Sequence, residues 1–270
     1  MKSTSSYYLD HFYFPDQNHE FLNSLLSRGY TNYKSETRHP GGITCRFIPF
    51  KNEDKNIKSP YLEFLHIDPS SDEERITGLS LGAFDSLDEI FKNNEAIQKN
   101  QGYLFHKNYE WDKYPDERRV GWNFIRFDNN PPIKDLFFWI TEYEKDPNAG
   151  PQPRVLFNQD NSTLRVCGCI LLLSPDEVEL MGELLDTKPD GNKFHMQFDE
   201  YIEFHDRNSS AFLGKDYNLP GIILECESLD TFIKVAKPEE LREINGTKYA
   251  IIKNHSKGWD LYTKEKIISI

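Results

Sequence analysis

The chain has 270 residues and a mass of 31.7 kDa, enough for one large domain or two ordinary ones. It contains 44 acidic residues against 32 lysines and arginines, which gives a formal net charge of −12. This charge disfavours a general nucleic-acid binder, because such a protein needs a positive face to neutralise phosphates. Aromatic residues make up 14% of the chain and argue against disorder, since disordered chains lack the apolar surface that offsets ordering entropy.

No apolar run approaches the roughly 18 residues that a membrane-spanning helix needs. The N-terminal segment reaches Asp10 and His11 before an apolar stretch of signal-peptide length forms, so we expect a cytoplasmic protein with no membrane partner. Four cysteines are too few for a disulfide scaffold. Cys167 and Cys169 alternate on a predicted strand, and we expect both to be small buried residues on one of its faces.

Hydrophobic periodicity predicts four units that begin alike, with a strand and then a helix. In the first unit, residues 9–14 form a strand, Asp16 caps the following helix and Gly29 ends it. Three strands follow, at residues 30–36, 44–50 and 61–67. The second unit repeats this order, with a strand at 79–84, a helix from 86, and strands at 103–110, 120–127 and 136–142.

The remaining two units are shorter. The third has a strand at 164–173, a helix at 174–185 and strands at 194–198 and 200–205; the fourth has a strand at 222–227, a helix from 229 and strands at 249–253 and 259–263. Two short echoes support repetition: Ser86-Leu87-Asp88 returns as Ser228-Leu229-Asp230, and Tyr61-Leu62-Glu63-Phe64 returns as Tyr201-Ile202-Glu203-Phe204. The polar stretch 145–153 separates the units into a first half at 1–145 and a second, degenerate half at 154–270.

Several motifs of the first half are familiar. They are Leu9-Asp10-His11, Arg38-His39-Pro40-Gly41-Gly42, Tyr61-Leu62-Glu63-Phe64-Leu65, Tyr114-Pro115-Asp116-Glu117-Arg118-Arg119 and Leu136-Phe137-Phe138-Trp139-Ile140. Together they resemble the glyoxalase-like proteins of the vicinal oxygen chelate superfamily. The resemblance implies an α+β fold of tandem βαβββ units, in which two units pair, their curved sheets enclose a cup and helices cover the outside. Because this fold serves both enzymes and non-catalytic drug-sequestering proteins, it predicts a pocket and not a reaction.

The resemblance also implies where a divalent metal would bind, through the first and fourth strands of each paired unit. His11 and Glu63 match these positions in the first unit. In the second unit Ser80, with Trp139 or Phe138, stands at the matching positions. Since catalytic metal sites generally keep three protein ligands, His39 is the candidate third ligand or general base, with Glu142 more remote.

The metal would be zinc, nickel, iron or manganese, and a metal-free His11–Glu63 hydrogen-bonded pair is an equally open alternative. Strand alternation independently places Leu9, His11 and Tyr13 on one face, with Phe12 on the other.

Four further residues are candidates for substrate binding in the cup: Tyr13, Arg46, Arg119 and Trp122. Arg46 stands where relatives tend to carry Asn, and it either binds an anionic group or pairs with an acid such as Glu63. The stretch Gly78-Leu79-Ser80-Leu81-Gly82 matches the nucleophile motif of α/β-hydrolases, but it lies within a predicted strand and no helix follows at once, so we set that function aside.

Three functions stay open at this point, and the sequence does not decide whether the protein is an enzyme. The leading hypothesis is small-molecule binding in the N-terminal cup, either alone or with metal-assisted lyase, isomerase or dioxygenase chemistry. The first alternative is a non-catalytic binding or sequestering protein. The second is a structural homodimer whose site has decayed.

Overall fold

The computed structural model describes residues 5–33, 36–39, 43–50, 60–67, 76–107, 122–143, 158–209, 212, 218–255 and 258–267. None of the helices within these ranges is both long enough and apolar enough to cross a membrane. The predicted boundary at residues 145–153 lies outside the described residues.

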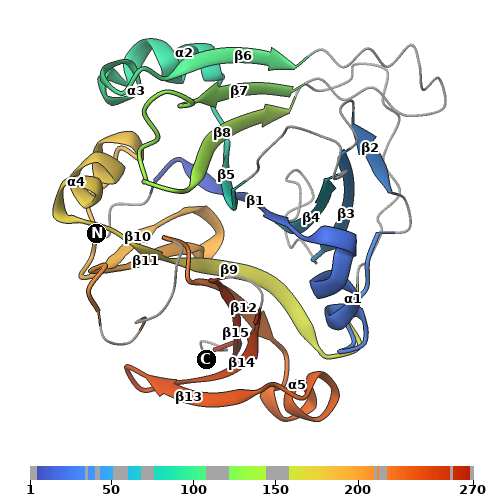
Figure 1. The fold of residues 1–270 in the computed structure, drawn as a ribbon. Coiled ribbons are helices and arrows are strands. Elements are labelled where there is room, and N and C mark those ends of the chain that lie inside the picture. Colours follow the sequence, from blue (N-terminus) through green and yellow to red (C-terminus); the bar gives the residue numbers. More distant parts are fainter. Residues whose placement is uncertain are drawn as a thin grey trace.

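The described chain forms two mixed β-sheets, one from each half (Figure 1). The first sheet has eight strands in the order β2-β3-β4-β1-β5-β8-β7-β6, and the second has seven in the order β10-β11-β9-β12-β15-β14-β13. The first half contains β1 (Tyr7–Pro15), a 3₁₀ turn (Gln17–His19), α1 (Glu20–Leu26), β2 (Thr37–His39), β3 (Ile43–Pro49), β4 (Tyr61–Ile67), β5 (Gly78–Ala83), α2 (Leu87–Asn93), α3 (Glu95–Lys99), β6 (Tyr103–Lys107), β7 (Trp122–Arg126) and β8 (Phe137–Tyr143). The second half contains β9 (Thr163–Leu172), α4 (Pro175–Leu184), β10 (Lys193–His195), a 3₁₀ turn (Gln197–Asp199), β11 (Tyr201–His205), β12 (Gly221–Cys226), α5 (Leu229–Ala236), β13 (Glu240–Ile244), β14 (Thr247–Lys253) and β15 (Asp260–Glu265).

Both sheets use the same pairing scheme. The first strands of two units, β1 and β5, lie antiparallel at the centre, and the last strands, β4 and β8, run parallel to them on either side. In the second sheet, β9 and β12 take the central places and β11 and β15 the flanking ones. This scheme confirms the predicted α+β fold of tandem units.

Two strands differ from the prediction. Residues 30–33 are irregular, and the second strand of the first unit begins only at Thr37. Strand β13 was not predicted, and it gives the fourth unit a full set of three strands after its helix. Three of its five residues are charged, and Leu241 is 63% exposed, which is typical of an edge strand and gives little apolar signal.

Helix starts follow the predicted local chemistry. The Asp16 carboxylate accepts the backbone N–H groups of Phe21 and Leu22 at 3.0 and 2.8 Å. Before α4, Ser174 and Glu177 form a reciprocal capping box. These bonds satisfy N–H groups in the first turn that a helix cannot pair internally.

Strand β1 contains a β-bulge at Asp10. Against β5, the register passes from Leu9 directly to His11, so Asp10 is an extra residue. Leu9 therefore joins Phe12 in the main core, while His11 faces the other side of the sheet. The expectation that Leu9 shares a face with His11 and Tyr13 was wrong, because the bulge resets the alternation.

Strand β9 has the same irregularity at Cys167. Against β12, the register passes from Val166 directly to Gly168. Cys169 packs with Val166 in the main core, whereas Cys167 packs on the opposite face. Both cysteines are buried as expected, but the prediction that they share a face was wrong for the same reason.

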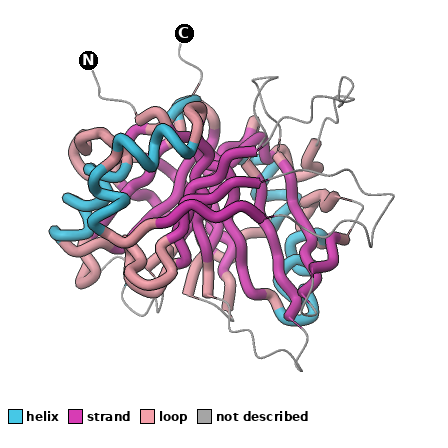
Figure 2. The backbone as a smooth tube through the Cα atoms, turned by 90° about the horizontal axis from the view of Figure 1, so that it is seen from above, coloured by secondary structure: helices cyan, strands magenta, loops and turns pink. Residues whose placement is uncertain are grey.

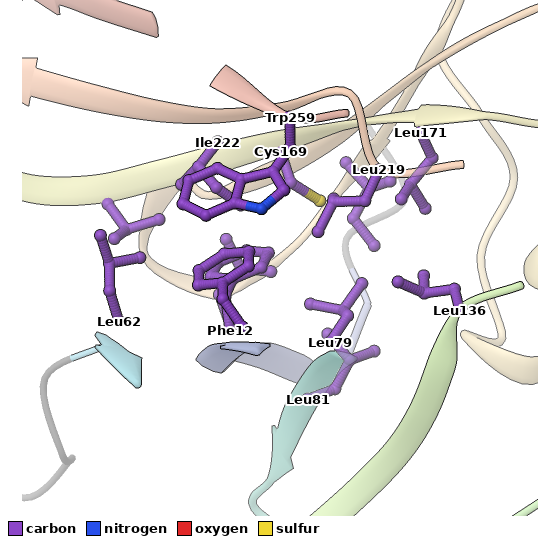
Figure 3. Close-up of a cluster of buried hydrophobic side chains, with 14 of the residues drawn as sticks. Phe12, Leu62, Leu79, Leu81, Leu136, Cys169, Leu171, Leu219, Ile222 and Trp259 are labelled. Atoms are coloured by element: carbon purple, nitrogen blue, oxygen red, sulfur yellow. The ribbon is translucent and has the colours of Figure 1, made fainter. Parts of the chain in front are cut away.

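The main core lies between the two halves, with strands running through the middle of the molecule and helices at its periphery (Figure 2). Figure 3 shows Phe12 and Leu79 of the first half facing Cys169 and Trp259 of the second. The Trp259 ring also stacks on Phe14, with 3.7 Å between ring centroids. The halves therefore share one apolar core.

A shared core predicts that both halves unfold together. We expect Trp259→Ala to lower the free energy of unfolding by about 3–5 kcal/mol, because it leaves a large cavity between them. Urea unfolding followed by circular dichroism, with amide exchange of β4 and β12, measures this. Leu241→Ala, at an exposed position, is the control and should change stability by no more than about 0.5 kcal/mol. Separate transitions for the two halves would contradict the shared core.

Candidate functional site

The first sheet has one face turned away from the main core, which we call the N-terminal cup face. It carries an apolar cluster of Tyr13, Ile43, Cys45, Leu65 and Trp139. Rings of Phe47, Phe124 and Phe137 pack against this cluster. His11 and Glu63 lie on the same face, as predicted from alternation in the first and fourth strands.

His11 is fixed by three contacts. Its Nδ1 lies 2.6 Å from Asp10 Oδ2, and its ring stacks on Tyr61 with centroids 4.5 Å apart. The same ring meets the Trp139 ring edge to face, with 5.1 Å between their centroids. An ionised carboxylate only accepts hydrogen bonds, so Nδ1 carries the proton. The opposite nitrogen, Nε2, points to Glu63 Oε2 at 3.5 Å.

Asp10 is fully buried and stands at the centre of a polar network. The Tyr143 hydroxyl donates to its two oxygens at 3.0 and 2.8 Å, and the Ser80 hydroxyl lies 3.2 Å from Oδ2. Ser80 also bonds Thr141 at 2.8 Å. Burial, with the charge of Asp10, raises the pKa of both Tyr61 and Tyr143 well above the usual value, so both phenols stay protonated.

Small residues on β5 make room for the rings of this face. A Cβ at Gly78 would lie 2.4 Å from the Tyr13 ring, and one at Gly82 would lie 2.1 Å from the Tyr8 ring. Between them, Ser80 is buried and hydrogen-bonded within a strand. The Gly-x-Ser-x-Gly stretch therefore seats aromatic rings, and its serine is not presented as a nucleophile.

The predicted site residues are not all brought together. Tyr13 lies on the N-terminal cup face, and Trp122 pairs with Tyr143 across β7 and β8 and so shares that face. Arg46 pairs with Phe64, a residue of the main core, and therefore lies on the opposite face from Glu63. Arg119 lies outside the described residues.

The backbone of His39 is far from His11. It pairs with Ile43 on β2, three strands from β1 in the sheet order, and Ile43 pairs with Ile67. His11 pairs with Tyr61, six positions back along β4, which corresponds to about 20 Å of strand. The structure does not bring His39 to the His11–Glu63 pair.

Three residues of the site were not identified from the sequence. Asp10 was hidden by the bulge, and Tyr143, not Glu142, is the β8 residue that reaches it. Glu142 lies on the other face, near the backbone N–H of Leu87. Tyr61 lies in the motif Tyr61-Leu62-Glu63-Phe64-Leu65, from which only Glu63 was predicted as a site residue.

Glu200, from the second half, forms a hydrogen bond to β1 next to the bulge. Its Oε2 accepts the backbone N–H of Leu9 at 2.6 Å, on a stretch where β1 has no β4 partner because their pairing begins only at His11. Glu200 is 3% exposed, and burial raises its pKa to about 8, although the Leu9 N–H and Arg165 lower it. A side chain of the second half thus completes the hydrogen bonding of the strand that carries the site.

Comparisons with known proteins support the fold alone. No family model and no curated protein matches the sequence. Among solved structures, a mutant of 4-hydroxymandelate synthase from Streptomyces coelicolor matches with a TM-score of 0.59 at 8% identity, over 98% of this chain and 92% of that one. Catechol 2,3-dioxygenase matches with a TM-score of 0.51 at 13% identity, over 98% and 89% of the two chains.

A xylose isomerase-like TIM barrel/4-hydroxyphenylpyruvate dioxygenase fusion protein matches with a TM-score of 0.55 at 11% identity. The match covers all of this chain but only 49% of the fusion protein, so this chain spans about half of that protein's length. The chain has the glyoxalase-like fold of the vicinal oxygen chelate superfamily.

The superfamily resemblance implied a metal between His11 and Glu63, and the donor set tests that implication. No group of three or more His, Cys, Asp or Glu side chains in the described part of the chain is arranged to hold a metal ion. Ser80 is committed to Asp10 and Thr141, and His39 is distant along the sheet. The described residues therefore supply two donors where a catalytic site generally has three, and they do not fit that kind of site.

The raised pKa of Glu200 makes stability depend on pH. A folded-state pKa of about 8 against an ordinary value of 4.5 means that the folded protein holds this proton more tightly. The stability that Glu200 contributes is full below pH 4.5 and is lost as the pH rises through about 8. We expect Glu200→Gln, which keeps an acceptor for Leu9, to gain stability relative to the parent across this window.

Urea unfolding at several pH values measures the difference. Glu203→Gln is the matched control, because the pKa of Glu203 is shifted in the opposite direction. Burial raises this pKa, but His205 and Lys193 lower it by more, so the net shift is downward. Its stability relative to the parent should fall as the pH rises. A pH-independent difference for Glu200→Gln would contradict the assigned shift.

Proposed function

We propose that the first half binds a small hydroxylated aromatic molecule on the N-terminal cup face, with His11 and Glu63 as its polar contacts. The observation that carries this proposal is the state of Glu63. Its side chain is 14% exposed, and within the described chain its carboxylate receives no hydrogen bond. A mostly buried carboxylate without a donor is costly, so a ligand that donates to it is favoured.

The repeat supplies an internal comparison. Glu203 occupies in β11 the place of Glu63 in β4, since each lies two residues after the tyrosine that pairs with the residue following the bulge of its central strand. Glu203 accepts from His205 at 2.8 Å and pairs with Lys193 at 3.4 Å. The same fold position is therefore satisfied internally in the second half and left open in the first.

The geometry of the pair favours two neighbouring O–H donors. With the proton on Nδ1, His11 Nε2 is an acceptor, as is Glu63, and their 3.5 Å separation suits adjacent hydroxyls of one ligand. Tyr61 and Trp139 add aromatic surface beside the pair. Two solved structures with this fold are named for catechol 2,3-dioxygenase and 4-hydroxymandelate synthase, which is compatible with an aromatic hydroxyl ligand here.

The second candidate function is metal-assisted lyase, isomerase or dioxygenase chemistry. The Asp10–His11 hydrogen bond favours it, because metal-binding histidines commonly donate their other N–H to a carboxylate. The missing third donor weighs against it. A structural homodimer with a decayed site is the remaining alternative.

The binding proposal is tested with catechol, phenol and benzene in a thermal-shift series. We expect catechol to stabilise most, and a ligand at about 100 times its dissociation constant raises the free energy of unfolding by about 2.7 kcal/mol. His11→Ala and Glu63→Gln should each weaken binding by about tenfold or more, because the first removes one polar contact and the second replaces a charged acceptor with a weaker neutral one. Glu142→Gln, a carboxylate on the opposite face, is the matched control. No shift with any of the three compounds, or equal binding by Glu63→Gln, would overturn the proposal.

Metal content separates the two candidate functions. We expect protein purified from metal-replete cells to carry less than about a tenth of an equivalent of transition metal, with no change in the double variant His11→Ala/Glu63→Ala, because two donors hold a metal weakly. Elemental analysis of both proteins measures this. About one equivalent in the parent that disappears in the variant would favour the metal-assisted enzyme.

A further inference from the structure

A cavity of about 650 Å³ lies away from the N-terminal cup face, where the helices of the first half meet the end of α4 from the second. In Figure 1, α4 lies beside α2 and α3 at one edge of the molecule. Its described lining carries five carboxylates and one ammonium group, from Asp85, Glu89, Glu95, Glu183, Asp186 and Lys99. The volume is typical of a small-molecule site, and such sites often lie between domains.

The charges of this lining are not balanced within the described chain. Lys99 lies 3.5 Å from Glu95, which accounts for one of the five carboxylates. The other four form no ion pair with a described residue. A lining with a net charge of −4 therefore faces the cavity with a single internal cation.

The end of α4 adds to this field. The carbonyl end of a helix carries a partial negative charge, which basic residues normally offset. Here the last turn of α4 contains no basic residue, Glu183 lies within it and Asp186 follows two residues after the helix ends. Asn94 donates to the carbonyls of Glu183 and Leu184 at 3.2 and 3.1 Å, which satisfies their hydrogen bonding but leaves the acidic side chains uncompensated.

A buried phenol is a second, independent indication of a ligand. Tyr7 lines the cavity and is only 3% exposed, yet its hydroxyl has no hydrogen-bond partner among the described residues. Burial and then the charges of Asp186 and Asp85, both in the cavity wall, raise its pKa. The phenol therefore stays protonated, and its oxygen can accept a hydrogen bond from an ammonium group in the cavity.

We propose that this cavity is a binding site for a small aliphatic oligoamine, a molecule with two or three ammonium groups on a flexible chain. The carboxylates are spread over α2, α3 and the end of α4, and no three of the described acids converge on one point as a metal ion requires. Separated ammonium groups match separated carboxylates, whereas a single compact cation meets only a few of them. Such a ligand would touch both halves of the molecule at once.

Calorimetric titration at low ionic strength tests the site with the triamine spermidine, the diamine putrescine, the monoamine butylamine and magnesium chloride. We expect saturable binding of spermidine, weaker binding of putrescine, and none of butylamine or Mg²⁺. Added salt should weaken the binding, because partly exposed charges are screened. The double variant Glu183→Gln/Asp186→Asn should bind spermidine at least about tenfold more weakly.

Two further variants keep the test specific. Glu179→Gln removes an exposed acid of the same helix outside the cavity and should bind as the parent does. Tyr7→Phe keeps the ring and loses the hydroxyl, so a loss of affinity in a variant with parental circular dichroism supports the oxygen's role. No saturable spermidine binding, equal weakening by Glu179→Gln, or Mg²⁺ binding as tight as spermidine would overturn the proposal.

Discussion

One extra residue in β1 determines how the site is built. Without the bulge, Leu9, His11 and Tyr13 would share a face, and Asp10 would point into the apolar core. With it, Leu9 enters the core and both Asp10 and His11 reach the N-terminal cup face as neighbours. The 2.6 Å contact between a carboxylate and the imidazole next to it in sequence depends on this irregularity, because successive residues of a regular strand point to opposite faces.

A buried carboxylate imposes the rest of the arrangement. Asp10 is fully buried, and a charge without partners in that place would cost several kcal/mol. Its donors come from three strands, with His11 on β1, Ser80 on β5 and Tyr143 on β8. Because these three donors are hydrogen-bonded to Asp10, none of them bonds to Glu63, although Glu63 lies on the same face. Glu63 is thus left without a donor among the described residues because these neighbouring groups are hydrogen-bonded to Asp10.

The sequence predicts those features that depend on neighbouring residues. Strand β4 matches its expected range, Asp16 caps its helix as expected, α4 begins within the expected range, and the order of elements repeats as the echoes indicated. Features that depend on strand register were not predicted from the sequence. Arg46 was assigned to the cup by its likeness to a family position, but only the pairing of β3 with β4 reveals that Phe47, not Arg46, stands opposite Glu63.

Contacts between distant segments could not be predicted from the sequence pattern. Tyr143 reaches Asp10 across 133 positions, and Glu200 reaches Leu9 across 191. Glu200 immediately precedes the echo Tyr201-Ile202-Glu203-Phe204, at the place that Pro60 takes before Tyr61. The departure from the repeat was therefore visible in the sequence, but its meaning depends on how the two halves pack.

The second half is best understood as the support of the first. Its own cup face is closed by charge pairs: Glu225 meets Arg165 at 2.8 Å and Lys264 at 3.5 Å, in addition to the pairs of Glu203. Gly168 stands where His11 stands in the first half, so the histidine of the proposed site has no counterpart there. What the second half contributes instead is Trp259 in the shared core and Glu200 on the bulge. The two halves therefore have different roles. The first half carries the proposed site, and the second half, which lacks it, supplies a hydrogen bond and apolar surface that hold β1 in its irregular conformation.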